Sequence, residues 1–78
     1  MINEQKFLKV FTSLFDETDP NDISMDTDFK NLAEWGSLIT LSAIVTMEEN
    51  FNKILTAKQI DKAETVKQLY NILNEEEL

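Results

Sequence analysis

Apolar residues recur at helical spacing in three stretches of this sequence, and this periodicity restricts the fold more than any other feature. The first stretch, residues 3–16, carries the apolar stripe of an amphipathic helix, formed by Phe7, Leu8, Phe11, Leu14 and Phe15. The last stretch, residues 65–74, repeats the pattern with Val66, Leu69, Tyr70 and Leu73. No β-hairpin signal accompanies them, and 78 residues suffice for one domain only. The sequence therefore predicts an all-α fold in a single domain spanning residues 1–78.

A long segment without helical periodicity separates the first two stretches. We expect Asn3 to cap the first helix and Pro20 to prevent its continuation, because proline disfavours helical geometry at the residue before it. The segment DISMDTDFKNLAEWG, residues 22–36, is predicted to be a loop held to the core by Ile23, Phe29, Leu32 and Trp35. A structureless loop of this length is uncommon in a compact domain and usually has a function.

Two further helices are expected to begin at a threonine. The sequences TAKQ at residues 56–59 and TVKQ at residues 65–68 both fit the capping box, in which threonine caps the helix and glutamine reaches back three residues. The first predicts a short helix over residues 56–62, with Ile60 facing inward. The second predicts a final helix over residues 65–74. With a helix over residues 37–51, we expect three longer helices, one short helix and a long first loop.

The helix over residues 37–51 is apolar around most of its circumference. Its inward side is predicted to carry Ala43, Ile44, Met47 and Phe51, and a second stripe, rotated away from the first, carries Leu38, Leu41 and Val45. A domain this small cannot surround a helix, so we expect the second stripe to be partly exposed. Exposed apolar surface flanked by acidic side chains is typical of a docking face, here with Glu34, Glu48 and Glu49. Alternatively, the loop covers this stripe with Phe29 and Leu32.

The ionisable side chains argue against several classes of function. The chain has neither cysteine nor histidine, so it lacks the commonest general base and the commonest metal ligands, and we do not expect an enzyme. A net charge of −8 disfavours nucleic acids and anionic membranes, which require clusters of basic residues. The charge favours docking on basic patches of other proteins.

The first residues, MINEQKFLKVF, lack the long apolar core of a secretory signal. No window of the sequence approaches the roughly 18 apolar residues of a membrane span. We therefore expect a cytoplasmic protein, and a monomer.

Ser37 opens the most apolar helix and directly follows Gly36, the only glycine. The simplest interpretation is that Ser37 caps this helix. A hydrolase nucleophile is excluded, since the chain has no histidine and EWGSL lacks the second glycine of a nucleophile elbow. An anchor for a phosphate ester is a further interpretation, because a helix N-terminus offers free N–H groups and positive potential. Gly36 would leave room for such a bulky modification.

The acidic stretch DETDPNDISMDTD raises a calcium site as another alternative. An EF-hand loop needs acids at alternate positions and a glutamate at position twelve. Counted from Asp19, position five is Ile23 and position twelve is Lys30; counted from Asp16, position five is Pro20. The stretch therefore fails as an EF-hand, and a solvated acidic loop explains it better.

In their order and spacing, three motifs of this chain resemble the acyl carrier protein family. They are Ser37-Leu38 at the start of the second helix, Glu48-Glu49-Asn50-Phe51 at its end, and Thr65-Val66 at the start of the last helix. The resemblance covers nearly the whole chain. It implies an all-α four-helix bundle with a long first loop.

By this resemblance, Ser37 would be esterified with 4′-phosphopantetheine from coenzyme A by a phosphopantetheinyl transferase. The arm would carry acyl intermediates as thioesters for fatty-acid, polyketide or related specialised biosynthesis. Acyl-transferring or acyl-modifying enzymes with basic docking patches would bind the stripe of Leu38, Leu41 and Val45. A growing acyl chain would lie between the helices, lined by Ala43, Ile44, Ile60, Ala63, Val66 and Leu69.

The chain departs from the family pattern at two places. The family usually has an aspartate before the serine, where this chain has Gly36, and typical fatty-acid carriers have acids where it has Ile39 and Ser42. The first departure implies slow loading, a dedicated transferase or loss of loading, with Glu34 as a partial substitute for the aspartate. The second implies specialised partners. The alternative function is a small acidic helical adaptor that binds other proteins and is never modified.

Overall fold

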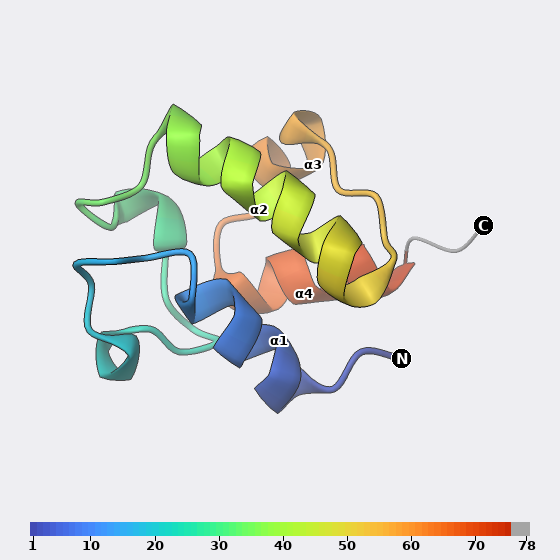
Figure 1. The fold of residues 1–78 in the computed structure, drawn as a ribbon, viewed down its shortest axis with the longest axis horizontal. Coiled ribbons are helices and arrows are strands. Elements are labelled where there is room, and N and C mark those ends of the chain that lie inside the picture. Colours follow the sequence, from blue (N-terminus) through green and yellow to red (C-terminus); the bar gives the residue numbers. More distant parts are fainter. Residues whose placement is uncertain (76–78) are drawn as a thin grey trace.

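A computed structural model of the chain describes residues 1–75 and is all-helical (Figure 1). Its α-helices are α1 (Glu4–Thr12), α2 (Ser37–Phe51), α3 (Ala57–Lys62) and α4 (Val66–Glu75). Two short 3₁₀ helices, η1 (Pro20–Asp22) and η2 (Phe29–Asn31), lie between α1 and α2. Residues 1–75 contain no strand. The predicted all-α fold, with three longer helices and one short helix, is confirmed.

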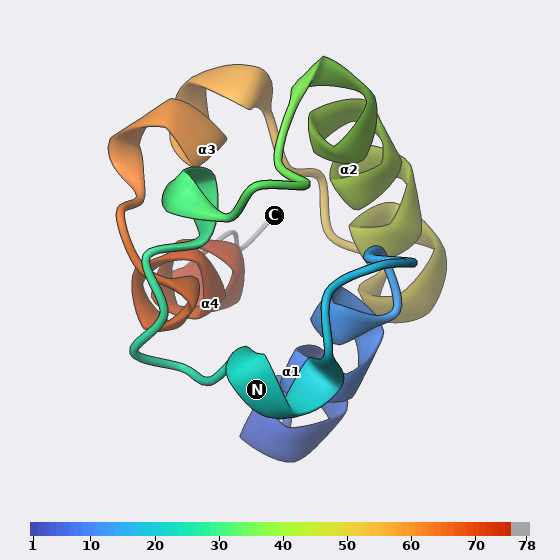
Figure 2. The same ribbon diagram turned by 90° about the vertical axis from the view of Figure 1, so that its left-hand side faces the viewer.

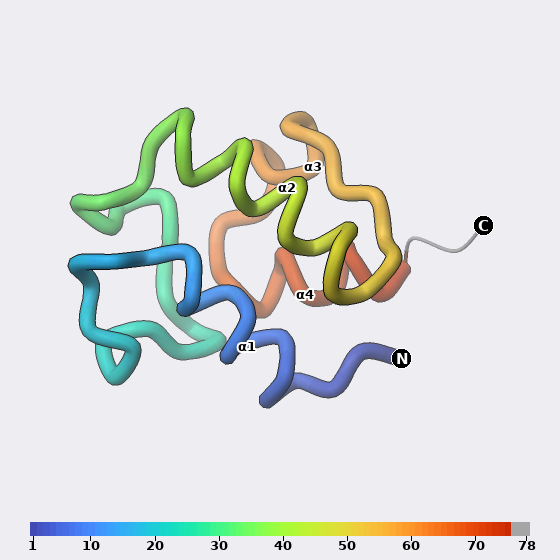
Figure 3. The backbone as a smooth tube through the Cα atoms, in the orientation of Figure 1, coloured from blue at the N-terminus to red at the C-terminus, as the bar shows by residue number. Residues whose placement is uncertain are grey.

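Each α-helix packs against two others. Helix α1 contacts α2 and α4, and α3 contacts the same two helices, so the four are arranged around a common centre (Figure 2). The connection formed by residues 13–36 lies at one end of the molecule, which is the end where α2 begins (left in Figure 3). Among residues 1–75, no helix has the length and apolar character needed to cross a membrane.

Aromatic side chains form a continuous network through the core. Phe11 is fully buried at its centre, with its ring centroid 6.1 Å from that of Phe7, 5.5 Å from Phe15 and 5.6 Å from Phe29. Trp35 packs edge-on against Phe29 with centroids 4.8 Å apart. The Phe7 ring extends the network to Phe51 in α2 and Tyr70 in α4. The network therefore joins α1, the long connection, α2 and α4.

The first helix is shorter than its apolar stripe predicts. Asn3 caps α1 as expected, with its side chain accepting from the Lys6 N–H at 3.0 Å. The helix ends at Thr12, because the hydroxyls of Thr12 and Ser13 donate to carbonyls of the preceding turn and the backbone tightens to i→i−3 hydrogen bonds. Phe15 lies outside the helix, yet this turn keeps its ring buried against Phe11.

The other helix boundaries agree closely with their sequence signals. Helix α2 ends where Asn52 adopts a left-handed conformation with φ of 56°, which asparagine tolerates better than most residues. Thr56 and Gln59 form the complete capping box of α3. The second box is only half formed, because Thr65 accepts from the Gln68 N–H whereas the Gln68 side chain accepts from Glu64.

The connection between α1 and α2 is more ordered than a structureless loop. Ile23 and Phe29 are buried and Leu32 and Trp35 are half-buried against the core, as predicted, but η1 and η2 add two helical turns. Backbone carbonyls of this connection also accept from the first two N–H groups of α4, at 2.8–3.1 Å. A helix has no acceptors of its own for these groups, so the connection completes the start of α4.

Candidate functional site

Ser37 is the first residue of α2, and the helix cap is Gly36. The expectation that serine caps this helix is therefore wrong. Gly36 is extended, with φ of −175° and ψ of −171°, and its carbonyl accepts from both the Thr40 N–H and the Thr40 hydroxyl at 2.9 Å. Glycine has no side chain to bond the first-turn N–H groups, which leaves the positive end of the helix beside the exposed Ser37.

The space around Gly36 is open. A Cβ atom built on Gly36 meets no other heavy atom within 4 Å. The extended backbone is also one that any residue adopts. Gly36 is therefore not required by packing or by backbone conformation, and the site has room for a larger residue or for a group attached to Ser37.

Glu34 binds the segment before Ser37 to the turn that follows α1. Its carboxylate accepts from the Asp16 N–H at 2.9 Å, from the Glu17 N–H at 3.2 and 3.3 Å, and from the Thr18 hydroxyl at 2.8 Å. Partial burial acts to raise the pKa of Glu34, but the hydrogen bonds from Thr18, Asp16 and Glu17 outweigh it, so the pKa lies below its ordinary value. The sequence predicted Glu34 as a docking residue; that role stays a prediction, and its structural role was missed.

The lowered pKa of Glu34 predicts a pH-dependent contribution to stability. A carboxyl whose folded-state pKa is lowered stabilises the fold above its unfolded-state pKa, and that contribution is lost as pH falls through the folded-state pKa. Glu34→Gln removes the charge, so we expect the gap in free energy of unfolding between wild type and variant to be largest near pH 7 and to shrink towards pH 3. Urea denaturation at several pH values measures the gap; a gap that does not change with pH contradicts the prediction.

The second stripe of α2 is exposed, as predicted. Leu38, Leu41 and Val45 are 76%, 61% and 54% exposed. The alternative, a stripe covered by Phe29 and Leu32, is wrong because both side chains pack into the core. The inward side also agrees with prediction: Ala43 and Met47 are buried, and Ile44 and Phe51 are half-buried. Glu48 and Glu49 are exposed in the last turn of α2.

The six side chains predicted to line an acyl pocket come from α2, the α3 region and α4. Ala43, Ile60, Ala63, Val66 and Leu69 are fully buried, and Ile44 is half-buried against the same core. Four of the six belong to the main cluster of buried side chains. The structure thus places them in the core, and their role as a pocket stays a prediction.

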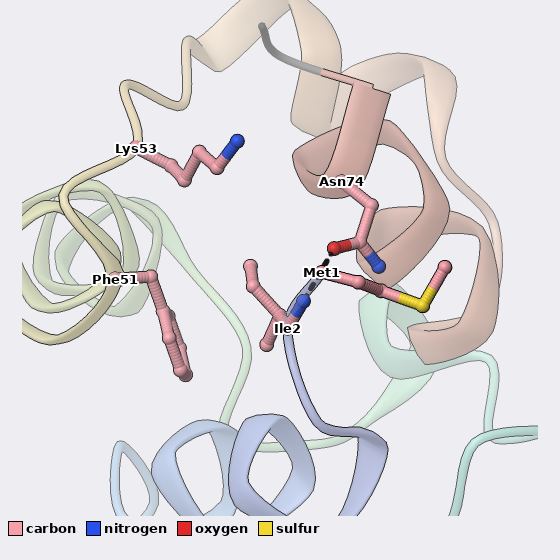
Figure 4. Close-up of a pocket in the computed structure, with 5 residues that line it drawn as sticks. All are labelled: Met1, Ile2, Phe51, Lys53 and Asn74. Atoms are coloured by element: carbon pink, nitrogen blue, oxygen red, sulfur yellow. Dashed lines mark hydrogen bonds between the residues drawn. The ribbon is translucent and has the colours of Figure 1, made fainter.

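A cavity that the sequence did not predict lies at the other end of α2, about 21 Å from Ser37 along a helix of 15 residues. It has a volume of about 450 Å³ and is lined by Met1, Ile2, Phe51, Lys53 and Asn74 (Figure 4). Asn74 accepts from the Ile2 N–H at 2.8 Å, and the Tyr70 hydroxyl donates to the Ile2 carbonyl. No sequence pattern signals these contacts, because their partners are about 70 residues apart.

The site is therefore an exposed serine at a helix start. Glu34 anchors the segment before it, and an exposed apolar stripe lies beside it. With no histidine in the chain, the commonest general base is missing beside this hydroxyl. Residues 1–75 contain no group of three or more carboxylates placed closely enough to hold a metal ion.

Comparison of the chain with models of protein families, with curated proteins and with solved structures finds no match.

Proposed function

We propose that this chain is an acyl carrier protein with the four-helix bundle of that family, and that Ser37 carries 4′-phosphopantetheine. The observation that carries the proposal is the exposed hydroxyl of Ser37 at the start of α2, next to open space at Gly36. The resemblance of Ser37-Leu38, Glu48-Glu49-Asn50-Phe51 and Thr65-Val66 to the family motifs supports the same conclusion.

The start of α2 suits a phosphodiester on Ser37. Attachment forms a bond between the Ser37 oxygen and the phosphorus of the arm, while the hydroxyl proton and the nucleotide part of coenzyme A leave. The resulting phosphodiester is negatively charged, and the first-turn N–H groups of α2 provide favourable positive potential. When bound, the arm supplies a thiol that carries the acyl group. The chain itself holds and presents the arm and catalyses no reaction.

Partner enzymes bind the exposed stripe of Leu38, Leu41 and Val45 in this proposal. The exposure of these side chains supports it, since apolar surface at a helix face is typical of a protein contact. Glu48 and Glu49 then meet basic residues of the phosphopantetheinyl transferase or of the acyl-transferring enzymes. Ala43, Ile44, Ile60, Ala63, Val66 and Leu69 line the space that the acyl chain enters.

The test is the intact mass of the protein after incubation with coenzyme A and a broad-specificity phosphopantetheinyl transferase. A standard carrier protein in the same tube controls for transferase activity. A gain of one phosphopantetheine supports the proposal. No gain while the standard carrier is loaded contradicts it and favours the unmodified adaptor, for which the exposed stripe would serve equally well.

Gly36→Asp is expected to speed loading several-fold and to stabilise the fold. An aspartate fits the open space and can cap α2, and its charge interacts favourably with the helix start. Together with the loss of glycine flexibility in the unfolded chain, we expect a gain of about 0.5–1 kcal/mol in the free energy of unfolding. Gly36→Asn is the matched control, since it caps the helix without the charge. Equal loading rates for Asp and Asn would show that the acid itself is not needed.

A further inference from the structure

Glu34 lies three residues before Ser37, and its side chain is hydrogen-bonded to an earlier part of the chain. Its two carboxylate oxygens take the N–H groups of Asp16 and Glu17 and the hydroxyl of Thr18, from a segment 16–18 residues earlier in the chain. Hydrogen bonds to an ionised carboxylate are about twice as strong as those between neutral groups. The contact therefore ties the segment leading into α2 to the turn that follows α1.

Trp35 holds the same segment from its apolar side. The centroid of its ring lies 4.8 Å from that of Phe29 and 6.3 Å from that of Phe15. The backbone N–H of Trp35 donates to the Leu32 carbonyl at 3.0 Å. Beyond Trp35 comes Gly36, which has no side chain and gives α2 no side-chain cap. Two adjacent residues, Glu34 and Trp35, thus anchor the backbone that leads into Ser37.

We propose that Glu34 is a positioning residue for Ser37, which it holds in one orientation towards the enzyme that modifies it. This inference rests on the proposed function, in which Ser37 is the site of attachment. Glu34 acts through the backbone of residues 35–37 and through its bonds to the turn after α1. A fixed serine spares the transferase the entropy of ordering a mobile segment, and a displacement of about 1 Å at a reacting atom can cost up to about 10²-fold in rate.

Three variants separate positioning from other effects. Glu34→Gln keeps the length of the side chain but removes its charge and one acceptor. Thr18→Val removes one donor and leaves the Glu34 charge in place. Glu17→Gln is the matched control, because Glu17 contributes its backbone N–H to the contact while its own side chain is exposed.

The first measurement is loading of each variant by the broad-specificity transferase, at a temperature where circular dichroism shows all of them folded. We expect kcat/KM to fall about tenfold for Glu34→Gln and less for Thr18→Val, with no change for Glu17→Gln. Unchanged kcat/KM for Glu34→Gln overturns the inference, since the contact is then purely structural.

The second measurement does not depend on modification. Amide ¹⁵N relaxation gives order parameters for Gly36 and Ser37, which we expect near 0.85 in wild type and clearly lower in Glu34→Gln. Unchanged order parameters overturn the inference even if loading succeeds. If the wild-type chain is not loaded while the standard carrier is, the proposed function fails, and the order parameters still decide whether Glu34 fixes Ser37.

Discussion

Ser37→Ala is expected to abolish attachment of phosphopantetheine, so that its intact mass is unchanged under conditions that load the parent. The hydroxyl oxygen is the atom that forms the new ester, and alanine has no atom to replace it. The fold is expected to remain intact, because Ser37 is exposed at the first position of α2 and alanine is the best helix former. Intact-mass spectrometry measures the loss directly, and urea denaturation checks stability.

Ser42→Ala is the matched control for this substitution. Ser42 lies on the same helix, five residues further on, and is half-buried; its loss should leave loading unchanged. If Ser37→Ala gains the same mass as the parent, another hydroxyl carries the group and the assignment of Ser37 is wrong. If both serine variants lose loading, the effect lies in α2 as a whole.

Phe11→Ala is expected to lower the free energy of unfolding by about 3–5 kcal/mol. The Phe11 ring is fully buried and touches Phe7, Phe15, Phe29 and Trp35, so alanine opens a cavity where α1 meets the long connection. A chain of 78 residues has a total stability of about 4–12 kcal/mol. The variant is therefore expected to lose a large fraction of this stability, which urea denaturation measures as a lower midpoint.

Two further variants keep this prediction testable if Phe11→Ala fails to fold. Phe11→Leu retains much of the buried volume and is expected to fold with a smaller loss. Leu8→Ala removes a half-buried side chain of the same helix and should cost clearly less than Phe11→Ala. Equal losses for the Leu8 and Phe11 variants would show that helix propensity, rather than the aromatic network, sets the stability of this region.

The helices could be predicted where local signals dominate. The capping box at Thr56 and the apolar pattern over residues 37–51 placed α3 and α2 within a residue of their observed bounds. The end of α1 could not be predicted from its apolar stripe. The hydroxyls of Thr12 and Ser13 take the last carbonyls of the helix. The turn after Thr12 nevertheless keeps Phe15, the last residue of the stripe, buried. A stripe of buried residues therefore does not by itself mark where a helix stops.

The candidate site was predicted in part. The exposure of Leu38, Leu41 and Val45 could be predicted from the size of the domain, because a chain this short cannot cover α2 on all sides. The role of Gly36 as the cap was missed, because serine is the stronger capping residue by its side chain alone. The hydrogen bonds of Glu34 were missed for a different reason: two of its partners are backbone N–H groups, which every sequence carries and no pattern marks.

The contact of Trp35 with Phe29 gives the protein a built-in optical reporter. Trp35 is the only tryptophan, so its fluorescence comes from one known place, two residues before Ser37. The indole is half-buried among aromatic rings at the junction of α1, the long connection and α2, where its emission responds to solvent entry. Unfolding of the core and changes at the start of α2 can thus be followed in the unlabelled protein by one spectroscopic signal.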